Sequence, residues 1–219
     1  MTLPLNKTLH PDDYLQLPKE LEIVDIAFTK AAEQHPARRW EYALAIDAFN
    51  RWEGQLEKNL SGPTYDVGGS GSPFYVMLDP YQVHVVDPRE IDGRDLQALL
   101  REGPRLGRAV FCLSVIEHIE RGIGQIDRFC YHLASLVAPG GLLVLTMDYA
   151  TSSQDTFHFH WMRERIVDPQ FYRWLIVTFE HYGFKLFGGI DQASHQQLVY
   201  HGPQVYDYTF ASLVLRKRA

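Results

Sequence analysis

The sequence predicts an α/β fold in which helices cover a mostly parallel β-sheet. Short apolar runs typical of buried strands alternate with segments whose apolar residues recur every three or four positions, as on one face of a helix. This alternation is the pattern of a layered α/β fold. A glycine-rich turn, residues 68–72, joins the first such strand to the start of a helix. Such a turn can cradle a nucleotide-like ligand, because glycines allow close approach and the helix start offers free N–H groups.

The composition is that of an ordinary globular protein. Of 219 residues, 46% are apolar and 22% are charged, which predicts a folded core and, for this length, one domain with an extension. No apolar run approaches the roughly 18–20 residues of a membrane helix. Prolines and acidic residues interrupt residues 1–17, where a signal peptide would be continuously apolar. We therefore expect a cytoplasmic protein with no membrane partner.

Charge and cysteine usage narrow the function further. The formal net charge is −6, whereas nucleic-acid binding needs clustered lysine and arginine, so no nucleic-acid partner is expected. Cys112 and Cys130 stand in apolar surroundings, which predicts buried thiols without a disulfide. The histidines lack the tight spacing of metal ligands, so no metal site is expected.

The first 60 residues are predicted to be a helical extension of a core that spans residues 61–219. A first helix is expected from Pro18 to about His35. The second helix carries an apolar residue at every fourth position: Trp40, Leu44, Ala48, Trp52, Leu56 and Leu60. The run Ser61-Gly62-Pro63 should end it. Glu41 and Tyr42 lie off this stripe and are expected on an exposed helix face.

The core should contain six strands and two well-defined helices. The strands are expected at Thr64–Val67, Val83–Val86, Ala109–Val115, Leu142–Met147, Phe184–Phe187 and Tyr208–Leu215. One helix lies between the third and fourth strands and should end at Pro139-Gly140-Gly141. The other follows a loop over residues 148–167, with Asp168 as N-cap, Pro169 as first helical residue and Gly183 as C-terminal stop.

An acidic residue supports the glycine turn as a nucleotide site. Asp87 ends the strand after the turn, where a carboxylate can bind ribose hydroxyls. A dinucleotide fingerprint read from Gly69 would place Phe74 at its third glycine, which is needed for close helix–strand packing. A nicotinamide-dependent oxidoreductase is therefore the less favoured interpretation.

Four segments in this order resemble the class I S-adenosylmethionine-dependent methyltransferases. They are Asp66-Val67-Gly68-Gly69-Ser70-Gly71, Val86-Asp87, Phe111–Ile119 and Ala138–Leu145. The resemblance covers about residues 60–215, and Ser114–Ile119 followed by Pro139–Gly141 is its most specific part. It implies a Rossmann-like sheet with helices on both faces, a last strand that is antiparallel, and S-adenosyl-L-methionine as cofactor.

The resemblance also implies roles for individual residues. Asp66 and Gly68 would line the methionine side of the cofactor, and Asp87 would hold the ribose hydroxyls. Gly69, Ser70 and Gly71 would back the ribose and sulfonium. Ser114, Val115 and His118 would lie beside the cofactor near the substrate. The family alternates its glycines as Asp-x-Gly-x-Gly-x-Gly, whereas here Ser70 and Ser72 occupy the later glycine positions.

The segment after Asp87 is short for this family. A helix, a strand and a further connection would need roughly 24 residues or more, but only positions 88–108 separate Asp87 from Ala109. We therefore expect the third strand of the family, at the sheet edge, to be missing or rudimentary. Asp92 or Asp95 could replace the acidic residue that meets the adenine in the family.

Three histidines are the candidates for catalysis. Histidine titrates in the range useful for a general base, and His118 should lie next to the cofactor. His158 and His160 belong to the loop expected over the substrate. Structural alternatives are a helix cap for His118 and a solvated lid for the other two. Glu41 and Tyr42 could instead reach over the cofactor.

The expected function is methyl transfer to a small-molecule or saccharide acceptor, with oxygen as the acceptor atom. The alternative is a catalytically degenerate methyltransferase-like binding protein.

Overall fold

The computed structural model describes residues 5–7, 37–56, 60–69, 83–86, 96–119, 123–150, 169–190, 200–201 and 207–219. Its strands are β1 (Thr64–Val67), β2 (Val83–Val86), β3 (Gly107–Leu113), β4 (Val137–Ala150), β5 (Phe184–Leu186), β6 (Tyr200–His201) and β7 (Asp207–Lys217). Its helices are α2 (Ala37–Glu53), α4 (Leu96–Arg101), the short 3-10 helix η3 (Ile116–His118), α5 (Ile123–Leu136) and α6 (Pro169–His181). None of these helices is long and apolar enough to cross a membrane.

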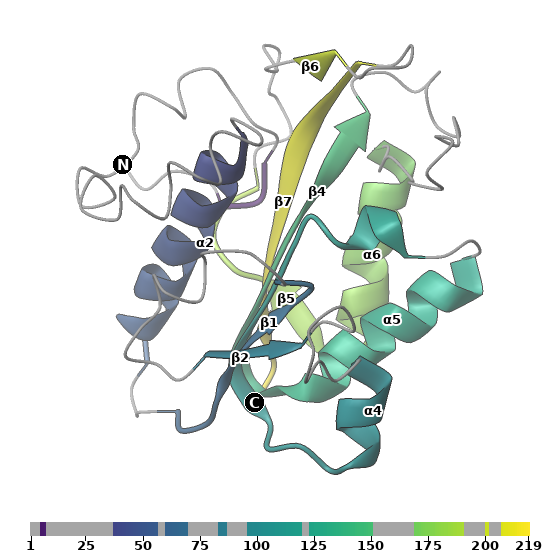
Figure 1. Ribbon diagram of the computed structural model, residues 1–219. Helices are drawn as coiled ribbons and strands as arrows, with labels where there is room; N and C mark the ends of the chain where they lie inside the picture. Colours follow the sequence, from purple (N-terminus) through teal and green to yellow (C-terminus); the bar gives the residue numbers. More distant parts are fainter. Residues whose placement is uncertain are drawn as a thin grey trace.

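The strands form one mixed sheet in the order β2-β1-β3-β4-β7-β5, with β6 paired to β7. The pairs from β2 to β4 are parallel, whereas β7 runs antiparallel to β4, β5 and β6. Between β2 and β3 the described residues form only α4, so β2 is the edge of the described sheet (Figure 1). The predicted fold class is confirmed, including the antiparallel last strand.

Both faces of the sheet are covered by helices, with α2 on one side and α4, α5 and α6 on the other (Figure 1). Alternate residues of β3 divide between the two cores, because successive side chains of a strand point to opposite faces. Phe111 packs on the α2 side, while Val110 and Cys112 pack on the other side. This double burial explains why β3 reads as a continuous apolar run.

Several predicted boundaries are wrong. The second helix ends at Glu53 and does not reach Leu60, because a tight turn with Gly54 and Gln55 follows it. Strand β3 ends at Leu113 and not at Val115, because Ser114 adopts φ +50°. Strand β4 begins directly after α5 and continues to Ala150. The helix stop at Gly183 is confirmed, since this glycine has φ +87° after α6.

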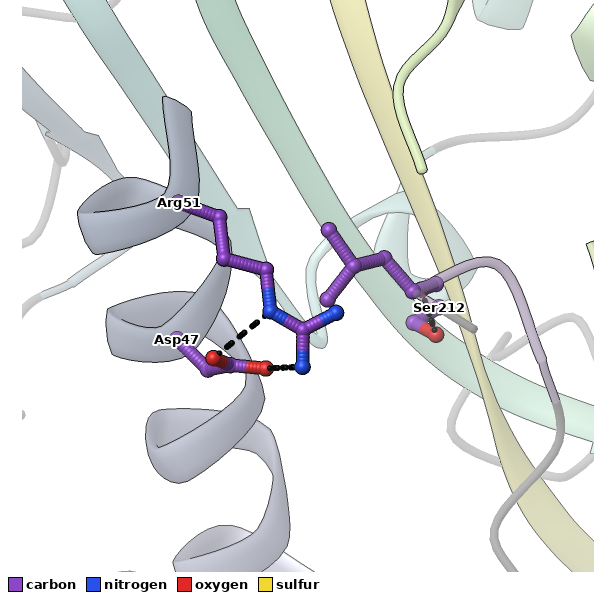
Figure 2. Close-up of polar contacts among 4 residues, drawn as sticks. Asp47, Arg51 and Ser212 are labelled. Carbon is purple, nitrogen blue, oxygen red and sulfur yellow. Dashed lines mark hydrogen bonds and ion pairs between the residues drawn. The ribbon is translucent and has the colours of Figure 1, made fainter. Parts of the chain in front are cut away.

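Residues 5–7 are bound along β7 by a buried asparagine. The Asn6 side chain donates to the carbonyl oxygen of Phe187 at 2.9 Å and accepts from the N–H of Val214 at 2.6 Å. The Ser212 hydroxyl donates to the carbonyl oxygen of Leu5 at 2.8 Å (Figure 2). Asn6 is fully buried, so these hydrogen bonds replace those that its amide would otherwise form with water. Residues 5–7 therefore provide hydrogen-bond partners for the part of β7 that pairs with neither β5 nor β6.

Asn6→Ala is expected to lower the free energy of unfolding by about 1–3 kcal/mol, because it leaves buried polar groups without partners. Arg51→Ala is the control. Arg51 forms a half-buried ion pair at 2.6 Å with Asp47, one turn earlier on α2 (Figure 2), and pairs at this helical spacing contribute about 0.3–0.5 kcal/mol. Urea denaturation measures both variants. An Asn6→Ala midpoint equal to that of Arg51→Ala would contradict the prediction.

Candidate functional site

Two turns meet where the strand order of the sheet reverses. β1 lies between β2 and β3, and all three run in the same direction. The turn after β1 holds Gly68 and Gly69, and the turn after β3 holds Ser114 to His118. Ligands of open α/β sheets bind outside the carboxyl ends of the strands at such a switch point. The geometry thus selects this edge as the candidate site.

Gly68 brings the two turns into direct contact. It has φ +85°, and its N–H donates to the carbonyl oxygen of Val86 at 2.9 Å. A Cβ placed on it would lie 2.3 Å from Cγ2 of Val115. Both the backbone angle and the contact exclude a side chain here. The predicted glycine turn is therefore packed against the predicted cofactor-side residue Val115.

A buried carboxylate lies against the same turn. Asp66 is 2% exposed, and a Cβ on Gly69 would lie 2.0 Å from its Oδ2 atom. Glu117, in the turn after β3, is buried to the same degree. Burial and the nearby charges of Glu117 and Asp66 raise the pKa of the Cys112 thiol well above its usual range. Two acidic groups thus flank the end of β3. Sequence reasoning predicted a site role for Asp66 and did not predict that Glu117 is buried.

A third buried carboxylate reaches the site from α2. Glu41 is fully buried, and its Oε1 atom accepts hydrogen bonds from the hydroxyls of Ser114 and Thr146, each at 2.5 Å. The N–H of Ser114 donates to the carbonyl oxygen of Thr146 at 3.0 Å. Ser114 is the one non-glycine residue with positive φ among the described residues. The carboxyl end of β3 and the neighbouring part of β4 are therefore tied to α2.

The predicted exposed face for Glu41 and Tyr42 is wrong, because these residues are 0% and 4% exposed. The helix lies flat on the sheet and buries more than one stripe. A signal for this was present in the sequence. Ala45 and Ala48 follow Glu41 at helical spacing and are both fully buried, and such small residues permit close helix–sheet packing.

His118 is the one predicted histidine that the structure describes. It ends η3 with an exposed side chain, and its N–H donates to the carbonyl oxygen of Val115 at 2.9 Å. The other predicted site residues lie outside the described residues: Ser70, Gly71, Asp87, Asp92, Asp95, His158 and His160. Within the described part of the chain, no three His, Cys, Asp or Glu side chains group as metal ligands would.

No protein-family model and no curated protein matches the sequence. Solved structures do match the fold. One is a SAM-dependent methyltransferase from Archaeoglobus fulgidus, with a TM-score of 0.52, 12% identity, and coverage of 87% of this chain and 99% of that one. Another is an S-adenosylmethionine-dependent methyltransferase from Clostridium acetobutylicum ATCC 824, with a TM-score of 0.51, 10% identity, and coverage of 88% and 98%. The chain therefore has the Rossmann-like fold of these methyltransferases.

Gly68→Ala is expected to destabilise the protein more than Gly183→Ala. The two glycines have φ +85° and +87°, but a Cβ meets Val115 at Gly68 and nothing within 4 Å at Gly183. The shared backbone cost is about 1–2 kcal/mol, and overpacking adds about 1–3 kcal/mol at Gly68 alone. Urea unfolding of the two variants measures the difference. Equal losses would show that the contact between the two turns contributes nothing.

Proposed function

We propose that the protein transfers a methyl group from S-adenosylmethionine to an oxygen of a small-molecule or saccharide acceptor. One observation carries this proposal. At the switch point of a methyltransferase-type sheet, a turn that only glycine can form, Gly68-Gly69, packs against the turn that begins at Ser114. The net charge of −6 supports a small acceptor in preference to nucleic acid.

The residues at this edge suit S-adenosylmethionine. Without a Cβ at Gly68 and Gly69 the backbone can approach a ligand closely, as a nucleoside requires. The cofactor carries positive charge on its sulfonium and amino groups. Asp66 and Glu117 supply negative charge in a buried setting, where attraction between opposite charges is stronger than in water. We assign Asp66 and Gly68 to the methionine side, Gly69 to the ribose and sulfonium, and Asp87 to the ribose hydroxyls.

The remaining assignments follow the order of the chain. Ser70 and Gly71 continue the turn beside the ribose, and Ser114, Val115 and His118 line the cofactor on the acceptor side. Bound S-adenosylmethionine supplies the methyl group for an in-line displacement. Positioning and removal of water provide much of the catalysis of such a step. His118 is the proposed base that takes the proton from the acceptor hydroxyl, and His158 and His160 are the other candidates.

Binding of S-adenosylhomocysteine to the wild-type protein should be measurable by titration calorimetry, whereas NAD should give no heat. Asp66→Asn is expected to weaken this binding by about 10–150-fold, since hydrogen bonds to a charged group contribute about 1.5–3 kcal/mol. Asp47→Asn is the matched control, because Asp47 is paired with Arg51 of the same helix and has no assigned role in the site (Figure 2). No binding of S-adenosylhomocysteine by the wild-type protein would refute the proposed function.

His118→Ala should lower turnover while leaving cofactor binding close to that of the wild type. Loss of a general base typically costs about 10²–10⁴-fold in rate. The measurement is transfer of labelled methyl from S-adenosylmethionine to a panel of hydroxyl-bearing small molecules and saccharides. His181→Ala is the control, since His181 ends α6 and is also exposed. Equal turnover of the two variants would remove His118 from the catalytic residues.

A further inference from the structure

We infer that Glu41 is a positioning residue for the glycine turn, Gly68-Gly69, at which the cofactor is proposed to bind. From α2, its buried carboxylate holds Ser114 in the conformation that places Val115 over Gly68. This inference rests on the proposed function, because it assigns a role to a residue outside the cofactor-binding motifs of the same site.

The carboxylate is placed for this role by its burial and its two partners. One oxygen of Glu41 accepts hydrogen bonds from two hydroxyls, at 2.5 Å each. The donors lie 73 and 105 positions away in the sequence. A buried carboxylate is costly unless such bonds compensate it, and bonds to a charged acceptor are the strong ones. Glu41 therefore links α2 to the end of β3 and to β4 through charge-assisted bonds.

The hydrogen bond to Glu41 acts on Ser114, whose backbone conformation is intrinsically unfavourable. Ser114 has φ +50°, a region that a residue with a Cβ visits only when its surroundings impose it. Its N–H donates to both the carbonyl oxygen and the hydroxyl of Thr146, at 3.0 and 3.1 Å. Its own hydroxyl is held by Glu41. Removing Glu41 deprives the side chain of its acceptor and frees the backbone to relax toward negative φ.

Such relaxation would change the direction in which the chain leaves β3. Val115 is the next residue, and its Cγ2 atom occupies the space next to Gly68. Glu117 and His118 follow in the same turn of η3. A rotation at Ser114 would move Val115 away from the glycine turn, and Glu117 and His118 with it. The consequence is that α2 controls the shape of the glycine turn through Ser114 and Val115.

The test is titration of S-adenosylhomocysteine into Glu41 and Ser114 variants. Glu41→Ala is expected to weaken binding about tenfold, within the range of effects for residues that couple to a distant site. Glu41→Gln, which keeps an acceptor oxygen, should lose less and serves if the alanine variant does not fold. Lys217→Met controls for general loss of stability. Lys217 donates to the carbonyl oxygens of Ala134 and Val137, where β4 begins and away from the candidate site.

A matched pair at Ser114 separates positioning from simple destabilisation. Glycine adopts positive φ without support, whereas alanine does not. Ser114→Gly should therefore bind S-adenosylhomocysteine at least about fivefold more tightly than Ser114→Ala. In the Ser114→Gly background, Glu41→Ala should have little further effect on binding, because the conformation no longer depends on the carboxylate.

The outcomes distinguish this inference from the proposed function. If the wild-type protein fails to bind S-adenosylhomocysteine, the proposed function is wrong and this inference falls with it. If the wild-type protein binds and folded Glu41 variants bind equally well, only the inference is wrong. An equal loss from Glu41→Ala in the wild-type and Ser114→Gly backgrounds would also overturn it.

Discussion

The parallel pairing of β3 with its two neighbours is the interaction on which the candidate site depends. In the strand register, Phe111 of β3 lies beside Asp66 of β1, and Leu113 of β3 lies beside Thr146 of β4. Because parallel strands end at the same edge, the turns after β1 and β3 become neighbours. β3 can occupy this central position because its side chains are apolar on both faces. An apolar strand thus organises an edge whose functional groups are polar.

Three carboxylates are buried at the candidate site, although burial of a carboxylate is unfavourable without compensating partners. Glu41, Asp66 and Glu117 are each buried to at least 98%, in a chain with a net charge of −6. Hydrogen bonds from Ser114 and Thr146 compensate Glu41. Asp66 and Glu117 lie near the position proposed for a cationic cofactor. The same arrangement that costs folding energy can therefore favour binding of positive charge.

Local patterns allowed most of the fold to be predicted. The two-sided apolar run of β3, the stripe of α6 and the stop at Gly183 depend on neighbours within a few residues, so the sequence reveals them directly. The glycine turn was recognisable from its run of glycines, one of which, Gly68, has positive φ in the structure. The resemblance to a known family contributed the antiparallel last strand.

What could not be predicted depends on tertiary contacts. Ser114 reads as a strand residue until Glu41 and Thr146 hold it in a left-handed conformation, and both lie far away in the sequence. Glu41 reads as an exposed charge because a stripe of every fourth residue describes only one face of α2. The contact of Gly68 with Val115 arises only when β1 and β3 are side by side.

That contact also has an evolutionary consequence. The methyl groups of Val115 fill the space that a side chain at position 68 would need, so the two positions share one volume. Position 68 must keep glycine because its φ is +85°, so a residue larger than valine at position 115 is tolerated only if the two turns move apart. Natural variants of this fold should therefore keep glycine at position 68 and a side chain no larger than valine at position 115. This joint restriction would preserve the geometry of the turn even where the sequence around it has diverged.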